Sequence, residues 1–313
     1  MTLTQLGAFV LVARLGSVTG AARALGVSEP AVSQALGALR RHLGDELVVR
    51  EASGMVLTPG GRRLVAIASQ MVSLGTEAEA AIRAARGAPD QLRVVAQATI
   101  AEYLAPGLLD AFERRSGSVE TSVGAAISEE MGALVQERLA DVALGPALGV
   151  GDRPGVESHP VMRSRLVVAA APGRHRLGGR PTWLVDPSFA DPAWPVAALL
   201  ARFRVRDDQI RVFPSQAAAV TAGVEGEGVV PVLEALVGTE LARGVLCRLE
   251  VPGTRVDLRW YASMLEPDRR SPAASSFRAF LGTPPAIELM HRPRRGQPPS
   301  RFRPPVYVTI WSS

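Results

Sequence analysis

The chain of 313 residues contains no lysine and a single cysteine. The lone Cys247 cannot form a disulfide within the chain, which favours a reducing compartment. No apolar run approaches the roughly 20 residues that span a bilayer, and the N-terminus lacks a basic region followed by an apolar core. These absences predict a cytoplasmic protein with no membrane partner and no signal peptide.

The absence of lysine changes how the net charge of +5 is interpreted. All 35 basic residues are arginines, and five of them lie beyond the last acidic residue, Glu288, so residues 1–288 contain 30 arginines and 30 acidic residues. The excess charge therefore belongs to the C-terminal tail. Residues 1–63 contain seven arginines and four acidic residues. A prediction of nucleic-acid binding must rest on this local placement and not on the total charge.

Motifs of common enzyme classes are missing as well. The chain has neither a G-x-S-x-G nucleophile turn nor a phosphate loop ending in G-K-S/T, and its four histidines are scattered. The glycine-rich segment 223–228 precedes a strand and contains two acidic residues, which are unsuited to cradling phosphates. We therefore predict no catalysis, no metal site and no cofactor.

Two short helical patterns are present in Ser17–Leu43, with room for only a tight turn between them. Ser17 can cap the first helix, which Gly26 ends. Ser28 can cap the second, and Pro30 falls in its first turn, where a missing N–H costs little. Two helices joined in this way are typical of a helix-turn-helix, whose second helix can enter the major groove of DNA.

The flanking residues extend this unit. Residues 3–13 predict a first helix, and Glu46–Leu57 predicts a β-hairpin whose turn is Ala52-Ser53-Gly54. A hairpin that follows a helix-turn-helix is a wing. Thr58 and Pro59 then provide the cap and the first residue of a long helix.

Apolar residues along that long helix alternate spacings of three and four over three heptads. They are Leu64, Ile67, Met71, Leu74, Ala78, Ala81 and Ala85. A 3.5-residue repeat is typical of a coiled-coil seam, although a face packed on its own domain is the alternative. We favour dimerisation, because two copies would present two recognition helices.

The remainder predicts an α/β fold of alternating strands and helices, with mainly parallel sheets covered by helices. The predicted strands are Leu92–Ala98, Val119–Ala125, Val142–Gly145, Arg165–Ala171, Ile210–Phe213, Val229–Val230, Leu246–Leu249 and Val256–Ala262. The predicted helices are Leu104–Arg115, Ser128–Leu139, Ala193–Phe203, Ser215–Gly223, Pro231–Arg243 and Pro272–Leu281. Residues 283–313 contain seven prolines and predict a disordered or loosely docked tail, with contact to nucleic acid or another subunit as the alternative.

In this order, the parts resemble a LysR-type transcriptional regulator over residues 1 to about 282. The residues that match the family's pattern most specifically are Phe9, Val12, Gly16, Ser17, Ala21, Ala22, Leu25, Val27, Ser28, Pro30, Ala31, Val32, Ser33, Leu39, Leu43, Gly44, Leu47, Arg50, Leu57, Thr58 and Gly61. The resemblance implies an N-terminal winged helix-turn-helix, a linker helix that dimerises, and two α/β subdomains resembling periplasmic binding proteins.

The implied domain limits follow the same comparison. They are 1–58 for the DNA-binding domain, 59–88 for the linker and dimerisation helix, 89–282 for the effector-binding domain and 283–313 for the tail. Within the effector-binding domain, subdomain I would take about 91–162 and 263–282, and subdomain II about 163–262.

The candidate DNA-binding residues lie on the second helix of the motif and on the wing. They are Ser28, Glu29, Pro30, Ser33, Gln34, Arg40, Arg41, Arg50 and Thr58. Gln34 can read adenine, Ser33 can serve a base or a phosphate, and Glu29 can accept from cytosine or remain a surface acid. The family usually has glutamine at the position of Glu29. By resemblance Arg50 binds phosphate, while Ser53 replaces a second basic residue of the wing.

The candidate effector-binding residues are Thr99, Ile100, Ser128, Pro146, Ser215 and Gln216. Thr99, Ser128 and Ser215 each follow a predicted strand and begin a helix, where free N–H groups favour an anion. Each could also be a plain helix cap. By resemblance the three positions border the space between the two subdomains, so an anionic effector is expected there.

The predicted function is that of a sequence-specific transcriptional regulator that responds to a small-molecule effector. Its expected partners are promoter DNA, the effector, further copies of the chain in a dimer or tetramer, and RNA polymerase. Two alternatives remain open, namely a small-molecule-binding protein of the periplasmic-binding type and an enzyme fused to a DNA-binding unit. The intact Ser17–Leu43 motif argues against the first, and turnover of a metabolite would be needed for the second.

Overall fold

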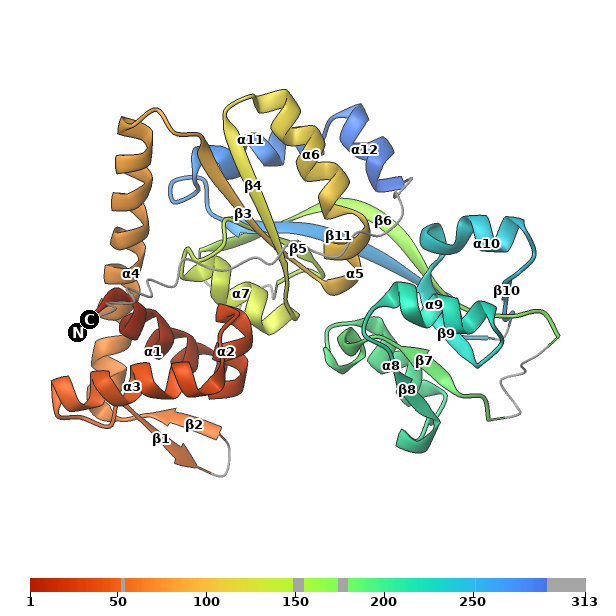
Figure 1. Cartoon of the computed structure of the whole chain (residues 1–313), viewed down its shortest axis with the longest axis horizontal. Coiled ribbons are helices and arrows are strands. Elements are labelled where there is room, and N and C mark those ends of the chain that lie inside the picture. Colours follow the sequence, from red (N-terminus) through yellow and green to blue (C-terminus); the bar gives the residue numbers. More distant parts are fainter. Residues whose placement is uncertain (52–53, 149–154, 174–179, 251, 292–313) are drawn as a thin grey trace, which may run out of the picture.

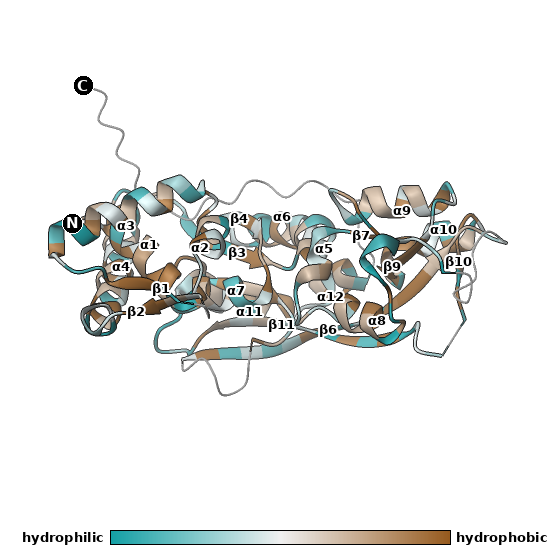
Figure 2. Cartoon of the chain, turned by 90° about the horizontal axis from the view of Figure 1, so that it is seen from below, coloured by the Kyte–Doolittle hydropathy of each residue, from teal (hydrophilic) through white to brown (hydrophobic). Residues whose placement is uncertain are grey.

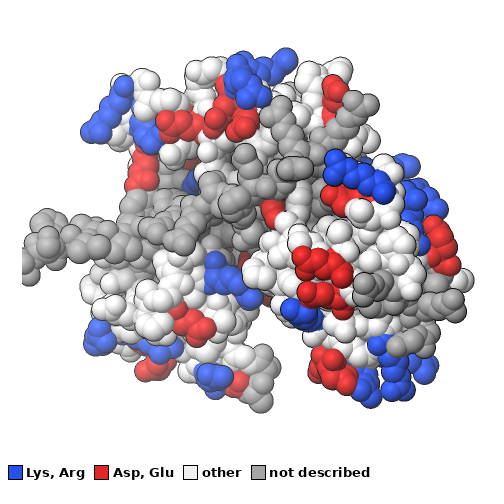
Figure 3. All heavy atoms as spheres, turned by 45° about the vertical axis from the view of Figure 1, so that its right-hand side comes forward, with Lys and Arg blue, Asp and Glu red and all other residues white. Residues whose placement is uncertain are grey.

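The computed structural model describes residues 1–51, 54–148, 155–173, 180–250 and 252–291. Within these ranges no helix is both long and apolar enough to cross a membrane. The molecule is elongated, with the helix-turn-helix at one end and α9, α10 and β10 at the other (Figure 2). Arginines and acidic residues are intermixed over the face that Figure 3 presents.

The N-terminal unit contains the predicted three helices and hairpin (Figure 1). Thr2 and Ser17 cap the first two helices through their side chains, and the left-handed Gly16, Gly26 and Gly44 end all three. The elements are α1 (Leu3–Leu15), α2 (Val18–Leu25), α3 (Glu29–Leu43), β1 (Val48–Glu51) and β2 (Gly54–Leu57). The predicted turn residues Ala52 and Ser53 lie outside the described residues.

The long helix α4 (Pro59–Ala85) begins as predicted, with the Thr58 hydroxyl accepting from the Gly61 N–H. One side of α4 packs on α1 and buries Ala68 and Val72. The other side leaves Ile67 55% and Leu74 62% exposed. The heptad face therefore points away from the rest of its own chain over much of its length.

The remaining strands form one nine-stranded sheet in the order β4-β3-β5-β11-β6-β9-β7-β8, with β10 paired to β6. The strands are β3 (Asp90–Ala96), β4 (Val119–Ala125), β5 (Val142–Gly145), β6 (Val156–Ala170), β7 (Trp183–Val185), β8 (Ile210–Val212), β9 (Val229–Leu233), β10 (Cys247–Arg248) and β11 (Val256–Leu265). The pairs β3/β4, β3/β5, β7/β8 and β7/β9 are parallel and the others antiparallel. The sheet is therefore mixed, and the prediction of mainly parallel sheets is wrong.

Strands β6 and β11 join the two halves of this sheet. They pair antiparallel along almost their whole length, with a register shift between Trp260 and Tyr261. We call the half around β3, β4 and β5 subdomain I, and the half around β7, β8 and β9 subdomain II. Because both long strands take part in both halves, the two subdomains share one hydrogen-bonded ladder.

Helices cover the sheet in both subdomains (Figure 1). The α-helices are α5 (Ala98–Tyr103), α6 (Ala105–Ser116), α7 (Ser128–Gln136), α8 (Pro195–Arg202), α9 (Gln216–Val224), α10 (Gly238–Ala242), α11 (Pro272–Leu281) and α12 (Pro284–His291). Short 3₁₀ turns are η2 (Pro187–Ala190), η3 (Asp207–Gln209) and η4 (Glu234–Val237). Their apolar faces enclose a core that includes Phe112, Phe277 and Trp260.

Several predicted segments differ from the structure. The strand predicted at Arg165–Ala171 is the end of β6, which begins at Val156, and the strand predicted at Leu92–Ala98 ends at Ala96. Pro231 lies in buried β9 and not in a helix over Pro231–Arg243, because the apolar run Val229–Leu233 fits a central strand as well as a helix. Strand β7 is missed. The tail prediction is wrong for 284–291, which form α12 and bury Ala286 and Met290, and the rest of the tail lies outside the described residues.

Candidate functional site

The recognition helix α3 buries one face and exposes the other. Val32, Leu36 and Leu39 are at most 2% exposed. The candidate DNA-binding residues Ser28, Glu29, Pro30, Ser33, Gln34 and Arg41 are exposed. Ser28 occupies the N-cap position, but its side chain makes no capping hydrogen bond. The N-terminal half of α3 thus offers free polar side chains at a helix end.

Arg40 has a structural task that the sequence does not reveal. Its Nε donates to the Glu46 carbonyl and its Nη2 to the Val48 carbonyl, each at 2.7 Å. These bonds tie α3 to the first strand of the wing. Because those donors are engaged within the chain, Arg40 is a weaker candidate for phosphate than Arg41.

The wing residue Arg50 and the neighbouring Thr58 also differ in how far they are engaged within the chain. Arg50 is exposed on β1, where it pairs with Met55 of β2. The Thr58 hydroxyl donates to Asp45 Oδ1 at 2.8 Å and accepts from the Gly61 N–H at 2.9 Å. These two bonds lower the freedom of Thr58 to donate to phosphate, so its helix-capping role predominates.

At the start of α5, the cap is Gln97 and not Thr99. The Gln97 Oε1 accepts from the Thr99 N–H at 2.9 Å. Gln97 and Thr99 are each 1% exposed, and Gln97 Nε2 and Thr99 Oγ1 are buried without a hydrogen-bond partner. Ile100 is 4% exposed and belongs to the apolar core. Two unsatisfied polar groups therefore lie at this end of β3.

The predicted anion site at the start of α7 holds a carboxylate of the chain itself. Asp191, which follows η2 in subdomain II, accepts from the Ser128 N–H and from the Ser128 hydroxyl, each at 2.9 Å. Asp191 is 2% exposed. Ser128 therefore adds a direct hydrogen-bonded contact between the two subdomains.

A second carboxylate lies near the start of α9. The backbone N–H groups of Gln216 and Ala217 are close enough to Glu102 of α5 to lower the pKa of its carboxyl, although burial outweighs them and raises it. Ser215 caps α9 through the Ala218 N–H at 3.3 Å, and the Gln216 amide lies 3.5 Å from the Pro231 carbonyl. An effector carboxylate at the start of α7 would have to displace Asp191.

Several acids create a negative potential beside α5. Burial, followed by the charge of Asp186, raises the pKa of Glu102. Burial and the carboxylates of Glu102, Asp186 and Glu240 raise the pKa of Tyr103. Pro146, which follows β5, is half-buried. The sequence analysis missed Gln97, Glu102 and Asp191. Asp191 could not be foreseen because its partner Ser128 lies 63 residues away, whereas Gln97 caps a residue only two positions on and could have been considered as a helix cap.

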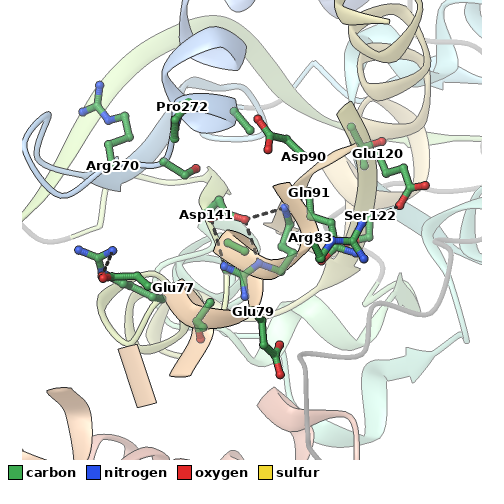
Figure 4. A pocket seen from close by; sticks show the side chains of 18 of the residues that line it. Glu77, Glu79, Arg83, Asp90, Gln91, Glu120, Ser122, Asp141, Arg270 and Pro272 are labelled. Carbon is green, nitrogen blue, oxygen red and sulfur yellow. Dashed lines mark hydrogen bonds and ion pairs between the residues drawn. The ribbon is translucent and has the colours of Figure 1, made fainter. Parts of the chain in front are cut away.

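A separate cavity of about 540 Å³ lies between α4, β3, β4 and the start of α11 (Figure 4). Three ion pairs line it. Arg83 reaches Glu120 at 3.3 Å, Arg138 reaches Glu77 at 2.7 Å, and Arg93 reaches Asp141 at 2.9 Å. This cavity borders the linker helix and includes none of the six predicted effector-binding residues. Its charges are largely paired within the chain.

Family models match most of the chain. Residues 3–62 match the bacterial regulatory helix-turn-helix protein model of the lysR family, and residues 85–283 match the LysR substrate binding domain. The chain belongs to the LysR family of transcriptional regulators. It is accordingly a DNA-binding regulator with an effector-binding domain, and the alternatives of an enzyme and of a binding protein without regulatory action fall away.

Relatives of this LysR-family regulator match it over nearly the whole length of both chains. An HTH-type transcriptional regulator of Mycobacterium tuberculosis, described as uncharacterized and called Rv0377, is 32% identical over 322 residues and covers 100% of both chains. Full-length LysG from Corynebacterium glutamicum with bound effector Arg is 20% identical, with a TM-score of 0.53 and coverage of 94% and 100%. Vibrio fischeri DarR in complex with DNA is 19% identical, with a TM-score of 0.51 and coverage of 90% and 98%. The two solved structures share the fold.

Proposed function

We propose that this regulator reads promoter DNA through the exposed N-terminal half of α3. The observation that carries the proposal is the division of α3 into a buried apolar face and an exposed polar face that bears Glu29, Ser33 and Gln34. Such a helix end fits the major groove, where an amide can pair with adenine and a hydroxyl with a base or phosphate. Arg41 and the wing residue Arg50 would then bind phosphates and fix the register.

The proposed active form is an oligomer of the chain. Ile67 and Leu74 on α4 are more than half exposed, and the smaller Ala78 continues the same face. A second α4 would bury these residues and set two α3 helices at a fixed separation. Leu64 and Met71 are half-buried against the chain's own core, so they would lie at the margin of the seam.

The proposed effector site lies between the subdomains, beside the buried and unsatisfied Gln97 and Thr99. An effector that hydrogen-bonds to these groups would relieve a cost of about 1–3 kcal/mol for each. Its expected anionic character stays a prediction, and at the start of α7 an anion would have to replace Asp191. We propose that the regulator acts in the cytoplasm on promoter DNA, and that binding of the effector there alters the activity of RNA polymerase.

DNase footprinting upstream of its own gene and of the neighbouring genes tests the role of α3. The double variant Ser33→Ala with Gln34→Ala is expected to weaken protection at least about tenfold, because one good base contact is worth about 1–3 kcal/mol. Ser275→Ala, an exposed hydroxyl on α11, serves as the control. Undiminished protection by the double variant would remove α3 from this role.

A further inference from the structure

Two carboxylates, Glu130 in α7 and Glu137 at its C-cap, contact the DNA-binding unit beside the apolar packing of α7. Arg23 Nε of α2 lies 2.5 Å from Glu130 Oε1, and Arg14 Nε of α1 lies 2.9 Å from Glu137 Oε1. Ser69 of α4 also donates to Glu137. Helices α1 and α2 pack against α7 in the fold (Figure 1). The helix-turn-helix is therefore fastened to the effector-binding domain at α7, as well as through α4.

Both carboxylates are buried at this contact. The side chains of Glu130 and Glu137 are 2% and 0% exposed, whereas those of Arg23 and Arg14 are 59% and 38% exposed. Burial raises the pKa of Glu130, and the Arg23 charge opposes that rise. Removing the partner of a buried charge is strongly destabilising. The two carboxylates thus add to the apolar packing of α1 and α2 against Met131, Leu134 and Val135 of α7 and give that contact a defined orientation.

The start of the same helix is fastened to subdomain II. Ser128 is its first residue and holds Asp191 through two hydrogen bonds of 2.9 Å. Glu130 follows two residues later, and its second carboxylate oxygen accepts from the Ile127 N–H at 3.2 Å. The contact to subdomain II and the contact to α2 therefore lie within one turn of α7. A displacement of that turn moves both.

We propose that α7 transmits the position of subdomain II to the helix-turn-helix, with Glu130 and Glu137 as positioning residues for DNA binding. Asp191 is the group of subdomain II that acts on α7. If an effector moves Asp191 relative to β3 and β5, the turn that carries Ser128 and Glu130 moves with it. The two α3 helices of an oligomer then change their relative orientation. This inference rests on the proposed function, since it concerns how the recognition helices are presented.

The test uses the full chain and DNA with two half-sites, taken from the protected region, at the native spacing or with one base pair inserted. The ratio of the two dissociation constants reports orientation, because an inserted base pair rotates one half-site by about a tenth of a turn. The variants are Glu130→Gln, Asp191→Asn and the two combined. Glu51→Gln on the wing controls for loss of a negative charge near DNA, and Asp110→Asn on α6 controls for an exposed Asp→Asn change.

We expect Glu130→Gln and Asp191→Asn each to change the ratio at least about fivefold, the lower end of ordinary coupling between sites. The combined variant is expected to match the single ones, because both changes interrupt one route. Glu51→Gln should change both dissociation constants by the same factor, and Asp110→Asn neither. An unchanged ratio in Asp191→Asn, or additive effects in the combined variant, would overturn the proposal.

Amide hydrogen exchange provides a second measurement that needs no DNA. Asp191→Asn is expected to increase exchange in α2, although Asp191 contacts α7 and not α2. A change confined to η2 and the start of α7 would mean a purely local role and would also overturn the proposal. If the wild type protects no DNA while α2 responds to Asp191→Asn, the proposed function fails and the coupling through α7 stands.

Discussion

A single added methyl group tests how the wing is joined to the linker helix. A Cβ on Gly61, in the first turn of α4, would lie 2.0 Å from the Leu47 carbonyl oxygen and 3.0 Å from Leu57 Cδ2. The Leu47 carbonyl belongs to the backbone and accepts the Thr58 N–H at 3.0 Å. Gly61→Ala must therefore displace the backbone at the start of the wing, because the nearest atom belongs to the backbone and not to a flexible side chain that could move aside instead.

The magnitude follows from the terms that change. Overpacking costs about 1–3 kcal/mol, and weakening the Thr58–Leu47 hydrogen bond costs about 0.5–1.5 kcal/mol. Alanine regains about 1 kcal/mol of helix propensity. The net loss of about 0.5–3.5 kcal/mol should lower the melting temperature of the DNA-binding unit by at least about 2 °C. DNA affinity should fall as well, because Arg50 moves with the wing.

The control is the same chemical change at a helical glycine with open surroundings. A Cβ on Gly7 of α1 meets nothing within 4 Å. Gly7→Ala should therefore stabilise the unit by about 0.5–1 kcal/mol. Both variants are measured by thermal unfolding with circular dichroism and by DNA titration. If Gly61→Ala melts at or above the wild-type temperature, the close approach of α4 to Leu47 does not constrain this junction.

The remaining predictions concern oligomerisation and pH. Leu74→Glu should yield monomers in size-exclusion chromatography with light scattering. Because Leu74 is 62% exposed, the same change should leave the melting temperature of the fold nearly unchanged. The control is Glu79→Gln, since Glu79 lines the cavity on another side of α4. Burial and Asp186 raise the pKa of Glu102 above its ordinary value of 4.5, so the folded state holds this proton more tightly than the unfolded state. The stability contributed by that proton is present below pH 4.5 and is lost as pH rises through the raised pKa. The melting temperature of Glu102→Gln, relative to that of the wild type, should consequently rise between pH 4 and 7. A difference that stays constant over this range would mean that burial does not raise the pKa of Glu102.

The N-terminal unit could be predicted from the sequence because its signals are local. Ser17 and Thr58 cap helices through residues three positions away, and Gly26 ends a helix by its own left-handed backbone. Such determinants can be recognised in a short window. The same holds for β4 and β5, whose limits coincide with the predicted ones.

The site between the subdomains could not be predicted in detail, because its determinants are far apart in sequence. Ser128 was identified as a helix start, but its partner Asp191 lies 63 residues away. Arg40 likewise is a surface arginine in the sequence and an anchor for the wing in the fold. The mixed sheet has the same origin, since β11 pairs with β5 and β6 only after the chain has passed through subdomain II.

The shared ladder of β6 and β11 determines how this protein can be taken apart. A cut between the subdomains would sever two strands whose backbone N–H and C=O groups pair from Val256 to Leu265 of β11. Each half would then expose unpaired strand edges, which favour aggregation. The smallest effector-binding fragment expected to fold therefore runs from β3 through α12, and thermal unfolding of that fragment should be a single cooperative transition. We therefore expect the two subdomains to unfold together, although they are distinct in shape.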